Sequence, residues 1–336
     1  MKAASGLAVG RQALPELARD AVTMALAQAG LQRADSVLLF LTRDFARHAQ
    51  PAVVAAARSA GCLAVAGSTA SGVLTEQAWQ FDQPAAAALV IGETSGPPGA
   101  LRLSFSGQRH LPADWQSAVQ RAGLVDADAA VWSQGRLAES GSADLALPGV
   151  ICRAACADGL RQMGDTVVAD LCQGYELRQV AGLPARDALL RALPAEWRER
   201  PPLHRIAIIR DAGEPAIAVL AIQPDGSLLL SETIPEGGAL HWAVRQPLAA
   251  HQQMRECLAA SSQGGGGPDF ALLFSCIGRG PLFYGDDDLD LIAFRERFPG
   301  VPLLGAYGSG QIVALPGGNR LFHNAALTLL FESSHV

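Results

Sequence analysis

The sequence has few charged residues, no basic excess and no long apolar run. Charged residues make up 17% of the 336 positions, and the net charge is -6. A chain without a basic surface has little to neutralise phosphates with, so we expect no nucleic-acid partner. No apolar run approaches the ~20 residues that span a bilayer, and residues 1–10 are too weakly apolar for a secretory signal. We therefore expect a cytoplasmic protein without membrane contact.

The cysteines lack the spacing of a zinc or redox site. Cys152, Cys156 and Cys172 form the only group among six cysteines, and no Cys-x-x-Cys pair is present. In a reducing compartment disulfides are not the default state of such residues. We interpret them as small apolar residues of the core.

The motifs of common enzyme classes are also absent. There is no Walker lysine, no Gly-x-Gly-x-x-Gly that opens a helix and no His-Glu-x-x-His, and the stretch at Gly67 and Ser68 is not a Gly-x-Ser-x-Gly elbow. A Ser-His-acid set can assemble in space without leaving a sequence mark. A hydrolase or transferase that uses Ser68 or Cys276 therefore stays open beside a non-catalytic protein.

The chain is rich in the residues that build a core. Hydrophobic residues make up 49% of it, and its length is sufficient for two domains. Apolar spacing, prolines at helix starts and glycines at helix ends predict an α/β protein with mixed sheets flanked by helices. The predicted helices cover 15–29, 51–60, 114–122, 184–200 with a break near Pro194, and 248–260. The main predicted strands cover 37–41, 63–66, 85–91, 101–105, 204–209, 216–222 and 227–230.

One local pattern occurs twice. The first copy runs from Asp35–Phe40 through a predicted helix to a strand ending in Gly67–Gly72. The second runs from Asp269–Phe274 to a strand ending in Gly305–Gly310. Each copy predicts a strand, a helix and a second strand that ends in a Gly-x-x-x-Ser-Gly turn. The duplication predicts two related lobes, with the paired turns near a ligand.

These turns and their neighbours resemble the FIST family of sensory domains. Phe274–Gly280 is similar to the family's Phe-Ser-Cys-x-Gly-Arg-Gly motif, and Val301–Gly310 is similar to its Val-Pro-x-x-Gly-Phe-Tyr-Gly stretch. Phe322–Asn324 matches its Phe-His-Asn, and Ala66–Gly72 is similar to an N-terminal family motif. The sequence departs from the pattern at Gln311, where the family often has glutamate.

The resemblance implies domain limits and a class of function. It divides the chain into a leader and helix over 1–33, a FIST N-terminal domain over 34–185 and a FIST C-terminal domain over 186–331. It implies a non-catalytic sensor of a small ligand in bacterial signalling, acting through a separate partner such as a histidine kinase or a cyclic-di-GMP enzyme. Amino acids are proposed ligands of the family, and some members resemble haem proteins that sense nitric oxide.

The predicted ligand site consists of hydroxyl, glycine and arginine residues at the strand ends. Glycine lets backbone N–H groups approach a ligand, and such a group of donors suits a carboxylate or phosphate. The alternative is that the glycines only form tight turns. The predicted ligand-binding residues are Gly67, Ser68, Thr69, Ser71, Ser275, Arg279, Tyr307 and Ser309.

Two features have competing interpretations. Arg279 is placed to clamp a carboxylate, or to form a structural pair with an acid within 286–288. The acidic run 286–290 lacks the spacing of a calcium loop, so we expect it to form a helix N-terminus. For a haem, His241 is the first candidate for the axial ligand, and the alternative is a packed or exposed histidine without a cofactor.

Overall fold

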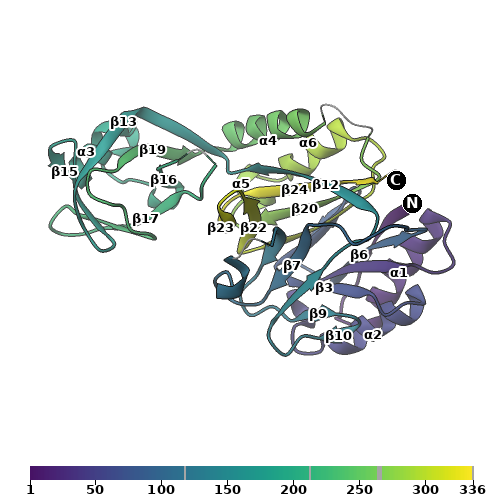
Figure 1. Cartoon of the computed structure of the whole chain (residues 1–336). Coiled ribbons are helices and arrows are strands. Elements are labelled where there is room, and N and C mark those ends of the chain that lie inside the picture. The colour runs from purple at the N-terminus through teal and green to yellow at the C-terminus, as the bar shows by residue number, and fades with distance from the viewer. Residues whose placement is uncertain (117–118, 212, 263–266, 335–336) are drawn as a thin grey trace. The chain divides into compact units, whose positions relative to one another are not determined.

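The computed structural model describes residues 1–116, 119–211, 213–262 and 267–334 (Figure 1). The chain forms two compact units, which we name the sandwich unit (residues 1–158 and 253–336) and the barrel unit (residues 159–252). The predicted division at 1–33, 34–185 and 186–331 follows the family pattern and has different limits from these compact units. It stays a prediction of where the family domains begin and end.

The first sheet of the sandwich unit contains the first copy of the repeat. Its strand order is β1-β6-β2-β3-β9-β10. Strands β2 and β3 are parallel, with Leu39 opposite Gly67, and β6 is antiparallel to β2. The strands are β1 (Lys2–Val9), β2 (Ser36–Thr42), β3 (Val65–Ala70), β6 (Ala85–Gly92), β9 (Val131–Ser133) and β10 (Arg136–Leu137).

The second sheet repeats this arrangement. Its order is β12-β24-β20-β21-β4-β5, so β12, β24, β20 and β21 take the places of β1, β6, β2 and β3. Strands β20 and β21 are again parallel, with Leu273 opposite Gly305. The strands are β4 (Gly72–Thr75), β5 (Trp79–Gln80), β12 (Val150–Ala157), β20 (Phe270–Cys276), β21 (Leu303–Gly308) and β24 (Ala326–Ser333).

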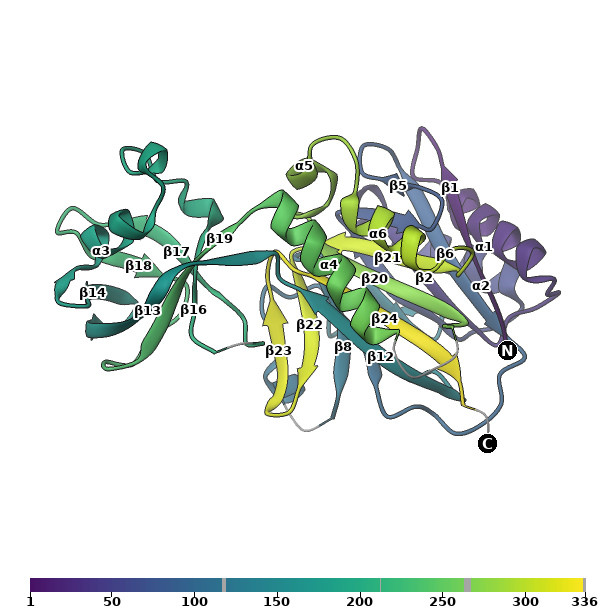
Figure 2. The same ribbon diagram turned by 90° about the horizontal axis from the view of Figure 1, so that it is seen from above.

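The two sheets pack face to face between two layers of helices. Alternate residues of β2 and β20, such as Phe40 and Phe274, fill the central core, while their neighbours Leu39 and Leu273 lie under the helices. A strand buried on both faces has a continuous apolar sequence, which explains the two predicted strands. Figures 1 and 2 show α1 and α2 on one outer face and α4 and α6 on the other. The helices are α1 (Pro15–Ala29), α2 (Ala49–Ala60), α4 (Pro247–Ser261), α5 (Gly280–Tyr284) and α6 (Leu289–Arg297), with a short turn η1 (Arg43–Phe45) after β2.

Two equivalent phenylalanines of the repeated first strands meet at the centre of this core. The rings of Phe40 and Phe274 lie 5.8 Å apart in an edge-to-face arrangement, and both contact Phe105. Edge-to-face aromatic pairs are worth about 0.5–1.5 kcal/mol beyond the area they bury. The predicted α/β class with mixed sheets is confirmed, and the two copies are the two sheets of one compact unit.

A third sheet completes the sandwich unit, in the order β11-β7-β8-β22-β23. Its strands are β7 (Arg102–Ser106), β8 (Arg121–Val125), β11 (Ser142–Leu145), β22 (Gly310–Leu315) and β23 (Gly318–Phe322). The helix predicted over 114–122 is wrong: a short turn, η2 (Ala113–Gln116), precedes β8 there, and residues 117 and 118 lie outside the described residues. Gly123, the glycine directly after this predicted helix and therefore its expected end, lies within β8, where a Cβ would come 1.9 Å from the Ser104 carbonyl oxygen.

The barrel unit has no counterpart in the first copy. Six strands close on themselves in the order β13-β19-β16-β17-β18-β14 and back to β13, every pair being antiparallel, and β15 adds to β14. In the sequence the barrel follows β12, at the point where β1 of the first copy leads into α1. Its elements are β13 (Leu160–Gln173), β14 (Glu176–Val180), β15 (Leu183–Pro184), α3 (Ala185–Ala192), η3 (Ala195–Trp197), η4 (Leu203–Arg205), β16 (Ile206–Ile209), β17 (Ile217–Ile222), β18 (Leu228–Leu230) and β19 (Ala239–Arg245).

None of the helices in the described part of the chain combines the length and the apolar character that crossing a membrane requires.

Candidate functional site

The two predicted turns lie against each other in the sandwich unit. Ser71 links β3 to β4, and its backbone N–H donates to the Tyr307 carbonyl oxygen of β21 (2.9 Å). Gly72 then pairs with Tyr307 across β4 and β21. The chain thus passes from the first sheet to the second at this turn, which brings the ends of both repeated strand pairs together.

The first turn is shorter than predicted. Gly67, Ser68 and Thr69 belong to β3, whose six residues are all buried, so the turn begins only at Ser71. The Thr69 hydroxyl accepts a hydrogen bond from the Ala130 backbone N–H at 2.9 Å. A Cβ at Gly67 would come 1.9 Å from the Leu39 carbonyl oxygen, so this glycine allows close approach of two parallel strands. These three residues are buried within β3 and do not line the largest of the clefts described below, which favours the structural interpretation, and their role in ligand binding stays a prediction.

The predicted residues of the second copy are also buried or bonded. Ser309 donates to the Val125 carbonyl oxygen from its backbone N–H (2.9 Å) and from its hydroxyl (3.1 Å). Ser275 is fully buried, and its hydroxyl has no hydrogen-bond partner among the described residues. Tyr307 is fully buried and donates from its hydroxyl to the Asp288 carboxylate.

Arg279 forms a structural ion pair. Its Nε and Nη2 donate to the two carboxylate oxygens of Asp290 at 2.7 and 2.9 Å, and its Nη1 donates to the Ala157 carbonyl oxygen at 3.0 Å. The side chains of the pair are 2% and 0% exposed. The pairing interpretation is therefore the one the structure supports, with Asp290 as partner instead of an acid within 286–288. To bind the carboxylate of a ligand instead, the Arg279 guanidinium would have to give up its ion pair with the buried Asp290.

The acidic run forms a helix N-terminus, as predicted. Asp288 caps α6, and its carboxylate accepts from the backbone N–H groups of Asp290 (2.9 Å) and Leu291 (3.0 Å). Burial raises the pKa of Asp288 from 3.8 to about 6, and the nearby Asp290 charge adds to this rise, while hydrogen bonds from Tyr307 and the backbone oppose it.

We expect this carboxylate to make stability fall as the pH rises from about 4 to about 6. In that window the folded protein holds a proton on Asp288 that the unfolded chain has released, so folding is favoured by acid. Asp288→Asn keeps an oxygen that can cap α6 but does not titrate, so the variant should show a flatter dependence of unfolding free energy on pH. Urea unfolding at pH 4, 5, 6 and 7 measures this. Asp287→Asn, a change at the neighbouring exposed residue, is the control, and an unchanged slope in Asp288→Asn would contradict the assignment.

A cleft of about 440 Å³ opens beside the meeting point of the two copies. It receives Arg43 after β2, Ser71 after β3 and Ile277 after β20, and thus lies beyond the carboxyl ends of strands from both copies. Crevices beyond the carboxyl ends of parallel strands are common ligand sites in α/β proteins. We name this the strand-end cleft; its lining residues are Arg43, Ser71, Trp79, Phe81, Asp82, Ile277, Pro281, Leu282, Gly285 and Asp286.

An ion pair and a serine form the polar wall of the strand-end cleft. Arg43 Nη2 and Nε donate to the two carboxylate oxygens of Asp126 at 2.6 and 3.2 Å, and the Ser71 hydroxyl lies 3.1 Å from the same carboxylate. The Arg43 side chain is 56% exposed, whereas that of Asp126 is 1% exposed. Burial raises the pKa of Asp126, against the lowering effect of Arg43 and Ser71.

Aromatic and aliphatic side chains form much of the rest of the cleft, together with the carboxylates of Asp82 and Asp286. The rings of Trp79 and Phe81 lie 5.4 Å apart, and Phe81 packs at 4.4 Å on the ring of Tyr307. Pro281 and Leu282 contribute from α5. Of the predicted ligand-binding residues only Ser71 lines this cleft. Sequence reasoning missed Arg43 and Asp126, although each is a charged residue placed directly after an apolar strand.

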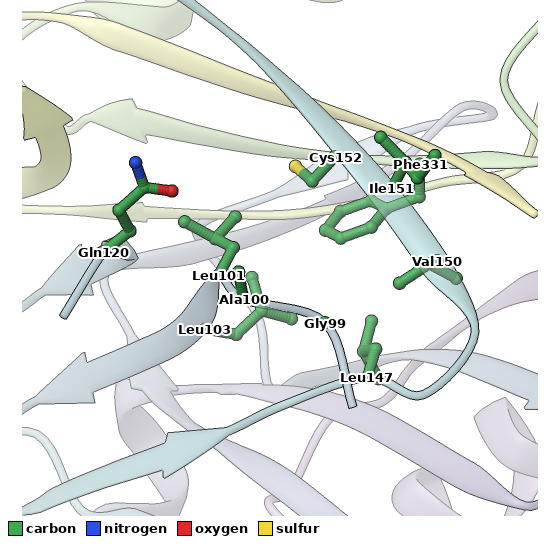
Figure 3. A pocket seen from close by; sticks show the side chains of 10 residues that line it. All are labelled: Gly99, Ala100, Leu101, Leu103, Gln120, Leu147, Val150, Ile151, Cys152 and Phe331. Atoms are coloured by element: carbon green, nitrogen blue, oxygen red, sulfur yellow. The ribbon is translucent and has the colours of Figure 1, made fainter. Parts of the chain in front are cut away.

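A second, smaller pocket of about 220 Å³ is lined mainly by apolar residues, with Gln120 as its one polar side chain apart from the Cys152 thiol. Figure 3 shows aliphatic side chains such as Leu101 and Val150 and the ring of Phe331 around it, with Gln120 at one side. Burial raises the pKa of Cys152 in this pocket to about 12, so its thiol stays protonated at neutral pH. The pocket therefore offers apolar contact and no reactive thiolate.

The remaining candidates lie elsewhere. His241 is partly buried on β19 of the barrel unit, between the core residues Leu240 and Trp242, with a ring nitrogen 3.2 Å from the Thr166 hydroxyl. Cys276 is 5% exposed and directs its thiol to the Ser309 carbonyl oxygen, and Ser68 is 2% exposed. His241 as a haem ligand, and Ser68 or Cys276 as nucleophiles, remain predictions.

The fold and the cleft define an α/β protein with a duplicated strand–helix–strand unit, an inserted barrel and a concave site where the copies meet. The FIST C domain model matches residues 185–314. This part of the chain is therefore similar to the FIST C domain, and the predicted resemblance to the FIST family is confirmed for it.

Two groups of mycobacterial relatives are also similar to the chain. An uncharacterized protein of Mycobacterium tuberculosis is 27% identical over 206 residues, which cover 57% of this chain and 54% of the relative. An uncharacterized protein of Mycobacterium bovis is 32% identical over 107 residues, covering 32% of this chain and 28% of the relative. The chain thus spans about half the length of the first of these relatives.

Proposed function

We propose that the protein is a non-catalytic sensor that binds a small ligand in the strand-end cleft. The observation that carries this proposal is the position of the cleft: it receives residues from the strand ends of both repeats and combines a polar wall with aromatic rings. Its volume of about 440 Å³ falls in the range of small-molecule sites. The FIST C domain supports a sensory role in signalling.

The wall of the strand-end cleft is connected to buried polar residues behind it. Phe81 packs on Tyr307, whose hydroxyl bonds to the α6 cap Asp288. On the other side Tyr284, the last residue of α5, donates to Asp290 at 2.9 Å. A ligand that moves either wall would therefore disturb the start of α6. We propose that such a change is passed to a separate signalling protein, such as a histidine kinase or a cyclic-di-GMP enzyme.

A cleft-narrowing substitution tests this function. Leu282 is 79% exposed and lines the strand-end cleft, so Leu282→Trp should obstruct the cleft without disturbing the core. A ligand at a hundredfold excess over its Kd stabilises the native state by ~2.7 kcal/mol, and we expect most of this to be lost in the variant. Thermal unfolding in a screen of amines, amino acids, haem and small metabolites measures the effect.

Leu248→Trp is the matched control for this experiment. Leu248 is 81% exposed at the start of α4 and does not line the strand-end cleft. This variant should respond to a cleft ligand as the wild type does. A ligand whose stabilisation is equal in Leu282→Trp and in the wild type binds elsewhere and would contradict the proposed site.

A further inference from the structure

The donors expected to bind an anion are used within the fold. The guanidinium of Arg279 is buried against Asp290, and the turn N–H groups of Ser71 and Ser309 donate to backbone carbonyl oxygens. The cleft's own arginine, Arg43, is held by the Asp126 carboxylate at 2.6 Å. The arginine side chains and turn N–H groups that would suit an anionic ligand are therefore already bonded within the protein.

Two carboxylates of the strand-end cleft have no such partner. Asp82 follows the β5 segment and Asp286 follows α5, and both are exposed. Neither forms an ion pair with any residue in the described part of the chain. With the Arg43–Asp126 pair internally neutral, these two groups make the cleft negative. A cleft lined by charges of one sign concentrates ligands of the opposite sign.

The apolar part of the strand-end cleft suits the same kind of ligand. Trp79 and Phe81 line the same cleft as Asp82, their ring centroids lie 5.4 Å apart, and the face of such a ring attracts a cation. Ile277, Pro281 and Leu282 add aliphatic surface for an uncharged portion of the molecule.

We infer that the strand-end cleft binds an organic cation with a small apolar body, an amine or a quaternary ammonium compound. This inference rests on the proposed function, because it names the ligand class of that same cleft. The acids supply the charge preference, the rings supply a face for the ammonium group, and the aliphatic residues bury the body of the ligand. It replaces the carboxylate or phosphate that the turn sequences suggested.

Three probes of similar shape and different charge test the inference on the full chain. Isothermal titration calorimetry compares 2-phenylethylamine, the neutral 2-phenylethanol and the anionic 3-phenylpropionate at fixed low salt. The amine should bind most tightly. Asp82→Asn and Asp286→Asn should each weaken it about threefold to fivefold, and the double variant about tenfold, as expected for exposed ion pairs. Asp287→Asn, at an exposed residue outside the cleft lining, is the matched control and should leave binding unchanged.

The outcomes separate this inference from the proposed function. If the neutral or anionic probe binds at least as well as the amine, and Leu282→Trp abolishes that binding, the cation preference is wrong and the cleft remains a ligand site. Binding of the amine that is insensitive to both aspartate variants also overturns the inference. If no probe binds and no screened metabolite loses its stabilising effect in Leu282→Trp, both proposals fail.

Discussion

Asp290→Asn is expected to lower the free energy of unfolding by about 3–5 kcal/mol, the cost of removing one partner of a buried ion pair. The substitution leaves the Arg279 guanidinium 2% exposed with its compensating charge removed. It also disturbs the 2.9 Å hydrogen bond from Tyr284. Because a domain's total stability is about 5–15 kcal/mol, this is one of the two largest single effects that we expect.

Urea unfolding of purified protein measures this loss. Asp20→Asn is the matched control: Asp20 pairs with Arg19 at 2.9 Å, but both side chains are about half exposed, so the substitution should change the free energy of unfolding far less. If Asp290→Asn does not fold, Tyr284→Phe removes only one hydrogen bond to the same carboxylate and should cost about 1 kcal/mol. Equal stabilities for Asp290→Asn and Asp20→Asn would show that the Arg279 pair does not stabilise the fold.

Gly67→Ala is expected to destabilise the protein by about 3 kcal/mol or more, at the upper end of overpacking effects. The new methyl group would lie 1.9 Å from the Leu39 carbonyl oxygen, and this atom belongs to the backbone of β2, which is held by β6 on its other side. The backbone φ of +151° at Gly67 adds strain for any residue with a side chain. Neither strand can move away without breaking the parallel pair.

The repeat supplies a second site for the same experiment. At Gly305 a Cβ would lie 2.3 Å from the Leu273 carbonyl oxygen, in the equivalent register of β20 and β21. Gly305→Ala should therefore also be strongly destabilising. Gly267→Ala is the control, since nothing lies within 4 Å of a Cβ there. Thermal unfolding compares the three variants, and a Gly67→Ala protein as stable as Gly267→Ala would refute the close approach of the strands.

Much of the sandwich unit was predictable because its signals are local. The helix predicted over 15–29 is α1, since its apolar spacing and the left-handed Gly30 at its end are both encoded within one segment. The strands β2 and β20 were predicted from continuous apolar runs, which burial on both faces requires. The acid run at 286–290 was correctly interpreted as a helix start because a cap depends only on neighbouring backbone groups.

The wrong helix at 114–122 and the open interpretation of Arg279 both concern residues whose role depends on a partner in another element. Gly123 has the appearance of a helix stop, yet it allows β8 to approach Ser104 of β7. Arg279 has the appearance of a ligand clamp until Asp290 is placed against it. In both positions the residue type indicates a special contact, a close backbone approach at the glycine and a charged partner at the arginine. The partner in each contact lies on another element, so the local sequence does not identify it.

By itself the sequence determined the α/β class, the repeated strand–helix–strand unit and the resemblance to the FIST family, because strand burial, helix periodicity and short motifs are properties of contiguous residues. Only the tertiary structure decided which side chains line the strand-end cleft. Ser71, Arg43 and Asp286 are far apart along the chain. They meet in one cleft because the two sheets pack face to face and the chain crosses from β3 in the first sheet to β4 in the second. Ion pairs formed in the folded chain neutralise Arg43 and Arg279, while Asp82 and Asp286 stay exposed. Which charges are paired depends on contacts between distant residues, so no local sequence pattern predicts it.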